Sequence, residues 1–191
     1  MKAGDTEGTN KVTQGETIDK DDTNTVITGE SDKNTVTIDT SEGNVDVTFD
    51  DLKIDVSGKT EVDSSSKTEG DVSGDSPVDA GKAAVTVQGD HDAAIELDGA
   101  NELKSGSHNA GLEKNGHESS GKLTIKDDND TKGSLTAEGG KDGAGIGGGY
   151  ESGAGNIEIT GGTVEAVGGE GAAGIAVSYT HLRAHETELH L

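Results

Sequence analysis

Short turns rich in Asp and Asn are the segments of this chain best suited to bind a ligand or a metal ion. The turn at 127–130 reads DDND, and comparable acidic runs stand at 20–24 and 69–75. Carboxylate and amide oxygens are the ligands that calcium prefers in proteins. A solvated turn, whose Asp and Asn side chains cap the backbone, is the alternative for the same residues. We predict calcium as the cofactor and, as its ligands, Asp127, Asp128 and Asp130.

An aromatic ring is the second feature suited to ligand binding, because it offers a flat apolar face to a ligand. Before residue 177 the aromatic residues are Phe49 and Tyr150. Phe49 alternates with Val47 in an expected strand, so we predict that its side chain lies in the core. Tyr150 follows the run GIGGG in an expected exposed turn. We predict Tyr150 as a carbohydrate-binding residue, with a plain surface tyrosine as the alternative.

The sequence contains no recognisable catalytic pattern, and we predict that the protein is not an enzyme. The Gly-rich segment 143–149 is followed by turn residues and an expected strand, whereas a dinucleotide site needs a following helix. Carboxylates are too abundant for one pair to indicate acid–base catalysis. Histidines in polar turns, without the spacing of metal ligands, are expected to be exposed: His91, His108 and His117.

Composition limits the partners of this chain and its fold class. The formal net charge of −23 argues against binding to nucleic acid or anionic membranes, which both need cationic surfaces. No apolar run is long enough to cross a membrane, and no signal peptide is recognisable, so we expect no membrane insertion. The apolar residues are mainly Val and Ile in short runs between Gly, Asp, Asn, Ser and Thr. This pattern is typical of short strands and turns, and it predicts an all-β fold.

Internal repeats indicate how these strands are arranged. Asn24, Asn34 and Asn44 each open a short β-branched run, ten residues apart. Further along, the segment 47–58 aligns without gaps to 95–106. The spacing predicts a turn and a short strand that recur along the chain.

The C-terminal repeats are longer and closer to one another. The segment 133–146 recurs as 162–175, and 121–125 recurs as 155–159. Each unit contains about two or three short strands between Gly-rich turns, which is typical of one coil of a parallel β-helix. An antiparallel β-sandwich is the alternative. The β-helix, or β-solenoid, predicts an inward ladder of Leu112, Ile146 and Ile175, with small residues beside it at Ala110, Ala144 and Ala173.

The domain organisation follows from these repeats and from shifts in composition. We predict a flexible N-terminal segment over residues 1–14 and a β-solenoid domain over 15–176, with 59–76 as a polar linker within it. Residues 177–187 (VSYTHLRAHET) closely resemble the translated read-through of a sequencing adapter seen in metagenomic assemblies. We therefore expect 177–191 to be a non-native tail, and the domain to be truncated at its C-terminus.

The stretch from about Val47 to Ile175 resembles repetitive bacterial cell-surface proteins of the carbohydrate-binding-domain or adhesin-like type. The residues that carry the resemblance are IELDGANELKSG (95–106), AGLE (110–113), and the Gly-rich runs 133–149 and 155–175. The resemblance implies a right-handed β-helix, secretion and, in some relatives, binding of calcium and acidic polysaccharide. It assigns no ligand residue to this chain.

Together these observations predict a non-catalytic extracellular or cell-surface module that binds a polysaccharide or a host glycan, with calcium. Because the protein is acidic, a uronic-acid polymer would need a bridging divalent cation. A structural spacer or adhesin stalk is the alternative, and a polysaccharide lyase or hydrolase is a remote one. We expect the protein to be a monomer.

Overall fold

The computed structural model describes residues 9–11, 16–19, 25–58, 81–117 and 119–176 of this chain. The described residues are all-β, and no helix long and apolar enough to cross a membrane occurs among them. The strands follow one another at short intervals, as the alternation of β-branched runs and turns predicts. In chain order they are β1 (Thr9–Lys11), β2 (Glu16–Ile18), β3 (Thr25–Ser31), β4 (Val36–Asp39), β5 (Val45–Asp55), β6 (Val85–Gln88), β7 (Ala93–Lys104), β8 (Leu112–Glu113), β9 (Leu123–Lys126), β10 (Gly133–Glu138), β11 (Ile146–Gly147), β12 (Ile157–Ile159) and β13 (Thr163–Val167).

All pairs between these strands are parallel, in two sheets. The larger sheet has the order β1-β3-β5-β7-β10-β13, with β9 pairing to β7 and β12 pairing to β9; the smaller has the order β11-β8-β6-β4-β2. Parallel neighbours need a crossover between them, so the two strands of each pair are separated by a further stretch of chain. This pairing is not the one that the antiparallel β-sandwich alternative requires.

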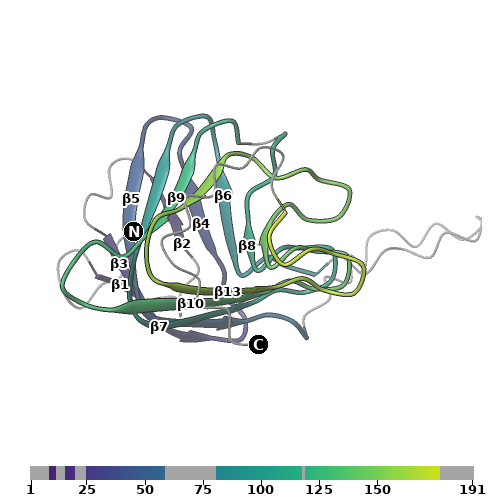
Figure 1. Ribbon diagram of the computed structural model, residues 1–191, viewed down its shortest axis with the longest axis horizontal. Coiled ribbons are helices and arrows are strands. Elements are labelled where there is room, and N and C mark those ends of the chain that lie inside the picture. The colour runs from purple at the N-terminus through teal and green to yellow at the C-terminus, as the bar shows by residue number, and fades with distance from the viewer. Residues whose placement is uncertain (1–8, 12–15, 20–24, 59–80, 118, 177–191) are drawn as a thin grey trace, which may run out of the picture.

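The long strands β5 and β7 each take part in two rows of the larger sheet. The first half of β7, Ala93–Glu96, pairs with β9, and its second half, Gly99–Lys104, pairs with β10. The smaller sheet forms a third row, so three rows of parallel strands line the core. In Figure 1, β7, β10 and β13 run along one side of the core, while β2, β4, β6 and β8 lie on another.

The repeats found in the sequence lie in register in the C-terminal half. Leu135 pairs with Val164, and Leu123 pairs with Ile157, as the alignments of the repeats predict. The ladder of Leu112, Ile146 and Ile175 is also present. Its first two members are fully buried, whereas Ile175 is 39% exposed. Ile175 lies at the end of the described residues, where it pairs with Ile146.

The gapless alignment of 47–58 with 95–106 is correct for its first part and wrong for its second. Asp50 pairs with Asp98, as predicted, but Ile54 pairs with Leu103 rather than with Glu102. A bulge causes this shift of one residue, because it inserts an extra residue into one strand of the pair. Asp51 lies at the bulge with a φ of 50°.

The core is built from the alternating apolar positions of these strands. Phe49 is fully buried, as predicted, and its neighbours Val47 and Leu52 are buried with it. Large aliphatic side chains from all three rows complete the cluster, among them Ile38, Ile125 and Leu135. Inward positions alternate with exposed polar positions, so the polar side chains collect on the outer faces and in the turns.

The described residues include only part of the segments that the sequence predicts at the ends of the domain and within it. Within the segment 1–14, Thr9–Lys11 forms β1 and pairs in parallel with β3, and the flexibility of this segment stays a prediction. The rest of this segment, the predicted linker at 59–76 and the tail at 177–191 lie outside the described residues.

Candidate functional site

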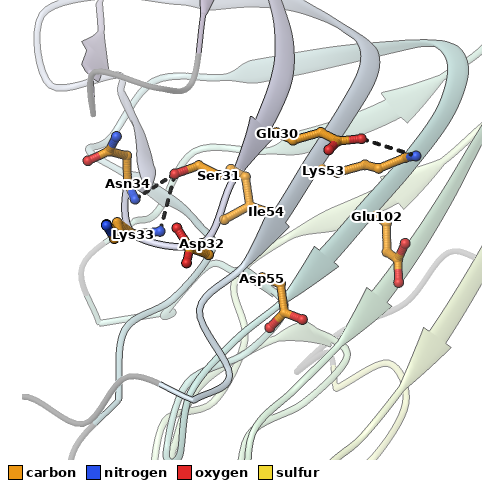
Figure 2. Close-up of a pocket in the computed structure, with 9 residues that line it drawn as sticks. All are labelled: Glu30, Ser31, Asp32, Lys33, Asn34, Lys53, Ile54, Asp55 and Glu102. Carbon is orange, nitrogen blue, oxygen red and sulfur yellow. Dashed lines mark hydrogen bonds and ion pairs between the residues drawn. The ribbon is translucent and has the colours of Figure 1, made fainter.

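A groove lies at the carboxyl ends of β3, β5 and β7, where these neighbouring strands lead into their turns (Figure 2). It has a volume of about 570 Å³. The sheet positions it, because parallel strands bring their carboxyl ends to one common edge. Its lining residues are Glu30, Ser31, Asp32, Lys33, Asn34, Lys53, Ile54, Asp55 and Glu102.

The side chains that line the groove are mostly polar residue types and carry both signs of charge. Ile54 is only 1% exposed, so the accessible lining consists of carboxylates, lysines, an amide and a hydroxyl. Lys53 Nζ lies 3.5 Å from Glu30 Oε1, across the β3–β5 pair. Glu102 Oε1 lies 2.9 Å from Lys104 Nζ on the same strand. These exposed pairs contribute little to stability, so the charges stay available to a ligand.

The turn after β5 holds one carboxylate of the groove in place. The Ser57 hydroxyl donates to Asp55 Oδ1 at 2.6 Å, and the Ser57 backbone N–H donates to the same oxygen at 3.1 Å. The side-chain hydrogen bond from Ser57 is the main cause that lowers the pKa of Asp55 below its ordinary value. Asp55 is therefore ionised at neutral pH and accepts hydrogen bonds.

The turn after β3 forms the opposite wall of the groove. The Ser31 hydroxyl oxygen accepts hydrogen bonds from the backbone N–H groups of Asn34 at 2.8 Å and of Lys33 at 3.2 Å. These bonds fix a tight turn, and Figure 2 shows Asp32, Lys33 and Asn34 grouped on that side. The arrangement presents hydrogen-bond donors and acceptors along one groove, which suits a ligand with many hydroxyl groups.

Tyr150 lies on the surface, as predicted, and belongs to a small polar cluster. It is 50% exposed. Its ring meets the ring of His108 edge to face, with centroids 5.0 Å apart and an interplanar angle of 78°. Its backbone N–H donates to the carbonyl oxygen of His108 at 2.8 Å. Asp142 completes the cluster, with Oδ2 lying 3.6 Å from His108 Nε2.

His108 departs from the exposed position expected for it. Its side chain is only 21% exposed, and its Nδ1 is buried without a hydrogen-bond partner. The Asp142 carboxylate and the Tyr150 ring account for this burial. The repeat contains a signal for the pair that sequence reasoning missed: His108 and Asp142 each stand two residues before the alanine of an AG motif, at Ala110 and Ala144.

His91 and His117 are exposed, as predicted. His91 Nδ1 lies 2.8 Å from the carbonyl oxygen of Thr40, which ties its turn to the preceding one. The Gly-rich segment 143–149 contains the short strand β11 and is followed by a turn and β12. The helix that a dinucleotide site requires does not follow it.

The turn proposed as a calcium site is held together by residues of the protein itself. Glu96 Oε1 accepts hydrogen bonds from the backbone N–H groups of Asp128 at 2.9 Å and of Asn129 at 3.3 Å. Lys126 Nζ lies 3.1 Å from Asp128 Oδ2 and 3.4 Å from Glu96 Oε2. The ammonium group of Lys126 is the first cause that lowers the pKa of Asp128. A cationic side chain therefore already lies between Asp128 of this turn and Glu96 of β7.

The remaining predicted ligands do not point to a common centre. Asp127 Oδ2 accepts a hydrogen bond from the backbone N–H of Gly133 at 3.3 Å, and Asp130 is exposed. Asn129 Oδ1 accepts from the Thr131 N–H at 2.7 Å, which is the Asx-type capping given as the alternative. Among the described residues, no group of three or more His, Asp or Glu is arranged to hold a metal ion. Calcium binding at Asp127, Asp128 and Asp130 stays a prediction, and the acidic runs at 20–24 and 69–75 lie outside the described residues.

No family model matches the chain, and no curated protein or solved structure is significantly similar to it. The groove and the Tyr150 cluster are the features of the molecule whose geometry and chemistry bear on its function.

Proposed function

We propose that this chain is a right-handed parallel β-helix that serves as a non-catalytic, extracellular or cell-surface module and binds polysaccharide. Three rows of parallel strands and repeats in register support the β-helix, because stacked coils produce both features. The large negative charge is consistent with a highly soluble surface module.

The groove at the ends of β3, β5 and β7 is the observation that carries the binding proposal. A sugar polymer presents hydroxyl groups that both donate and accept hydrogen bonds. Carboxylates such as Asp55 and Glu102 accept from hydroxyl donors, and Lys33 and Lys53 donate to hydroxyl oxygens. An open groove accommodates an extended chain, whereas an enclosed cavity would admit a small molecule.

The charge of the groove indicates which polysaccharides it can take. Four of its lining residues are carboxylates and two are lysines, so a polyanion is repelled. Neutral polysaccharides are the favoured class, and a uronic-acid polymer would require a bridging divalent cation such as calcium.

A structural spacer or adhesin stalk is the second candidate function. It is supported by a charged row across the larger sheet, in which Glu30, Lys53 and Glu102 stand opposite one another on β3, β5 and β7. Alternating charges on the outer face keep a stacked sheet soluble without any ligand.

A binding experiment separates the two functions. The protein, residues 1–191, would be titrated by calorimetry with neutral and acidic polysaccharides, first with calcium and then with a chelator. We expect saturable binding to a neutral polymer, and a loss of affinity in Asp55→Asn combined with Glu102→Gln. Asp46→Asn combined with Glu165→Gln is the matched control, since both residues are exposed and do not line the groove. A folded protein that binds none of the polymers in either condition would favour the spacer.

A further inference from the structure

We infer that Tyr150, His108 and Asp142 form a second sugar subsite, which holds one uncharged pyranose unit of a linear polysaccharide whose chain continues into the groove. The inference rests on the proposed function and extends it, because it names the ligand as a linear neutral polymer that crosses several strand ends.

The Tyr150 ring is held ready for stacking before any ligand arrives. The edge-to-face contact with His108 and the hydrogen bond from Tyr150 N–H to His108 O fix both its backbone and its ring. Half of the residue nevertheless remains exposed. A ring fixed in its binding orientation loses little conformational entropy when a ligand binds. A tyrosine side chain combines an apolar ring with a polar hydroxyl at its tip, which matches the apolar face and hydroxyl rim of a pyranose.

Asp142 supplies a hydrogen-bond acceptor beside this ring. Its side chain is 31% exposed, and its Oδ2 lies 3.6 Å from His108 Nε2, beyond hydrogen-bond distance. The carboxylate therefore remains open to a sugar hydroxyl. Acidic groups follow in the neighbouring turns at Glu151 and Glu170, both exposed, and they disfavour a sugar acid.

The backbone at these turns adopts the left-handed conformation at two residues that carry a Cβ atom. His108 has a φ of 68° and Asp142 a φ of 62°, in the left-handed region that is costly for most residues with a Cβ atom. The corresponding position in the next repeat is Gly171, which adopts a φ of 86° without that cost. His and Asp are among the residue types that adopt this region most readily, so these two turns carry a side chain where the next repeat carries none.

Strand order places this cluster beside the groove. The groove lies at the ends of β3, β5 and β7, whereas His108 follows β7 and Asp142 follows β10, the next strand in the sheet. Neighbouring strands are about 4.8 Å apart, so successive turns form a row along one edge. A linear polymer that runs along this edge crosses from the groove to Tyr150, and a short oligosaccharide reaches only one of the two.

Tyrosine fluorescence tests the subsite directly, because the chain contains no tryptophan and only two tyrosines. In Tyr179→Phe, all tyrosine emission comes from Tyr150. This variant of the 191-residue chain would be titrated with short and long oligosaccharides cut from neutral linear glucan, xylan and mannan. We expect the emission to change saturably with long oligosaccharides of one polymer, and Tyr150→Ala to weaken their binding about tenfold, as measured by calorimetry.

Matched variants show which residues take part in binding the oligosaccharide. Tyr150→Phe retains the ring and should keep most of the affinity, while Asp142→Asn should weaken binding and Glu165→Gln, at an exposed position outside the subsite, should leave it unchanged. Unchanged circular dichroism and thermal midpoints would exclude a folding defect. His108 is a positioning residue: His108→Ala should weaken binding less than Tyr150→Ala and should broaden the ring signals of Tyr150 in nuclear magnetic resonance spectra.

The possible failures are distinguishable. If a polymer binds with normal affinity in Tyr150→Ala, and its binding is lost with the groove variants, the subsite is wrong and the proposed function stands. If the emission of Tyr150 changes on titration but the groove variants bind with normal affinity, the subsite stands without the groove. If no polymer binds at any length, both are wrong.

Discussion

The side-chain oxygen of Asn101 accepts a hydrogen bond from the backbone N–H of Leu52 at 2.9 Å, inside the core. Asn101 is 3% exposed and belongs to β7, whereas Leu52 belongs to β5, at the point where the register of the two strands shifts. The Asn101 amide nitrogen donates to the carbonyl oxygens of Asp98 and Ser134, both at 3.0 Å. One buried side chain thus satisfies backbone groups on three neighbouring strands, where the bulge interrupts the regular ladder.

Replacing this amide should destabilise the protein strongly. Asn101→Leu fills a similar volume but leaves buried N–H and C=O groups without partners, at about 1–3 kcal/mol for each group. We expect the free energy of unfolding in urea to fall by at least about 2 kcal/mol. Asn44→Leu is the control, because Asn44 is exposed and accepts one hydrogen bond, from Asp92 N–H at 3.2 Å. An equal loss in both variants would contradict the role assigned to Asn101.

Close backbone approach makes Gly121 sensitive to the addition of a single methyl group. A Cβ atom at this position would overlap the carbonyl oxygen of His91 in the preceding turn. A Cβ atom at Gly58 meets nothing within 4 Å. We expect Gly121→Ala to lower the free energy of unfolding by more than about 2 kcal/mol, and Gly58→Ala to leave it nearly unchanged. Thermal and urea unfolding of the two variants test this difference.

Lys114 should make stability depend on pH in the alkaline range. Its side chain is fully buried, and its Nζ donates to the carbonyl and hydroxyl oxygens of Ser119 at 2.8 and 2.9 Å. Burial is the main cause that lowers the pKa of Lys114 below its ordinary value. Between the lowered pKa and about 10.4 the unfolded chain binds more protons, so this group makes the folded state more stable as pH rises through that window.

The variant Lys114→Met removes this contribution. We expect its stability relative to the wild type to decline as pH rises from about 7 to 10, because only the wild type gains. Lys141→Met is the control, since Lys141 is exposed, and its difference from the wild type should not change in this way. Urea unfolding at several pH values measures the trend, and a pH-independent difference for Lys114→Met would contradict it.

Asp55 should contribute to stability in the opposite range of pH. Its pKa is lowered in the folded state, so its contribution is present above about pH 4 and is lost as pH falls through the folded value. Asp55→Asn should therefore lose some thermal stability at neutral pH and less in acid. The effect is small, because Asp55 is exposed and screened by solvent. Asp46→Asn should show no such convergence with the wild type.

The sequence alone was sufficient to predict the all-β class, the buried Phe49, the exposed Tyr150 and the register of the C-terminal repeats. Each of these depends on a local pattern: alternation along one strand, a turn composition, or a repeat whose members stack directly on one another. The pairings of Leu135 with Val164 and of Leu112 with Ile146 follow from such repeats.

Tertiary structure decided the shift between β5 and β7, the place of His108 and the existence of the groove. The shift arises because the side chain of Asn101 accommodates a bulge, and the gapless alignment of 47–58 contains no sign of it. His108 meets Asp142 across 34 positions of sequence, and the groove joins the ends of β3, β5 and β7. Such contacts depend on which strands become neighbours, which a local pattern does not specify, because hydrogen bonding between parallel strands joins residues that are far apart in the chain.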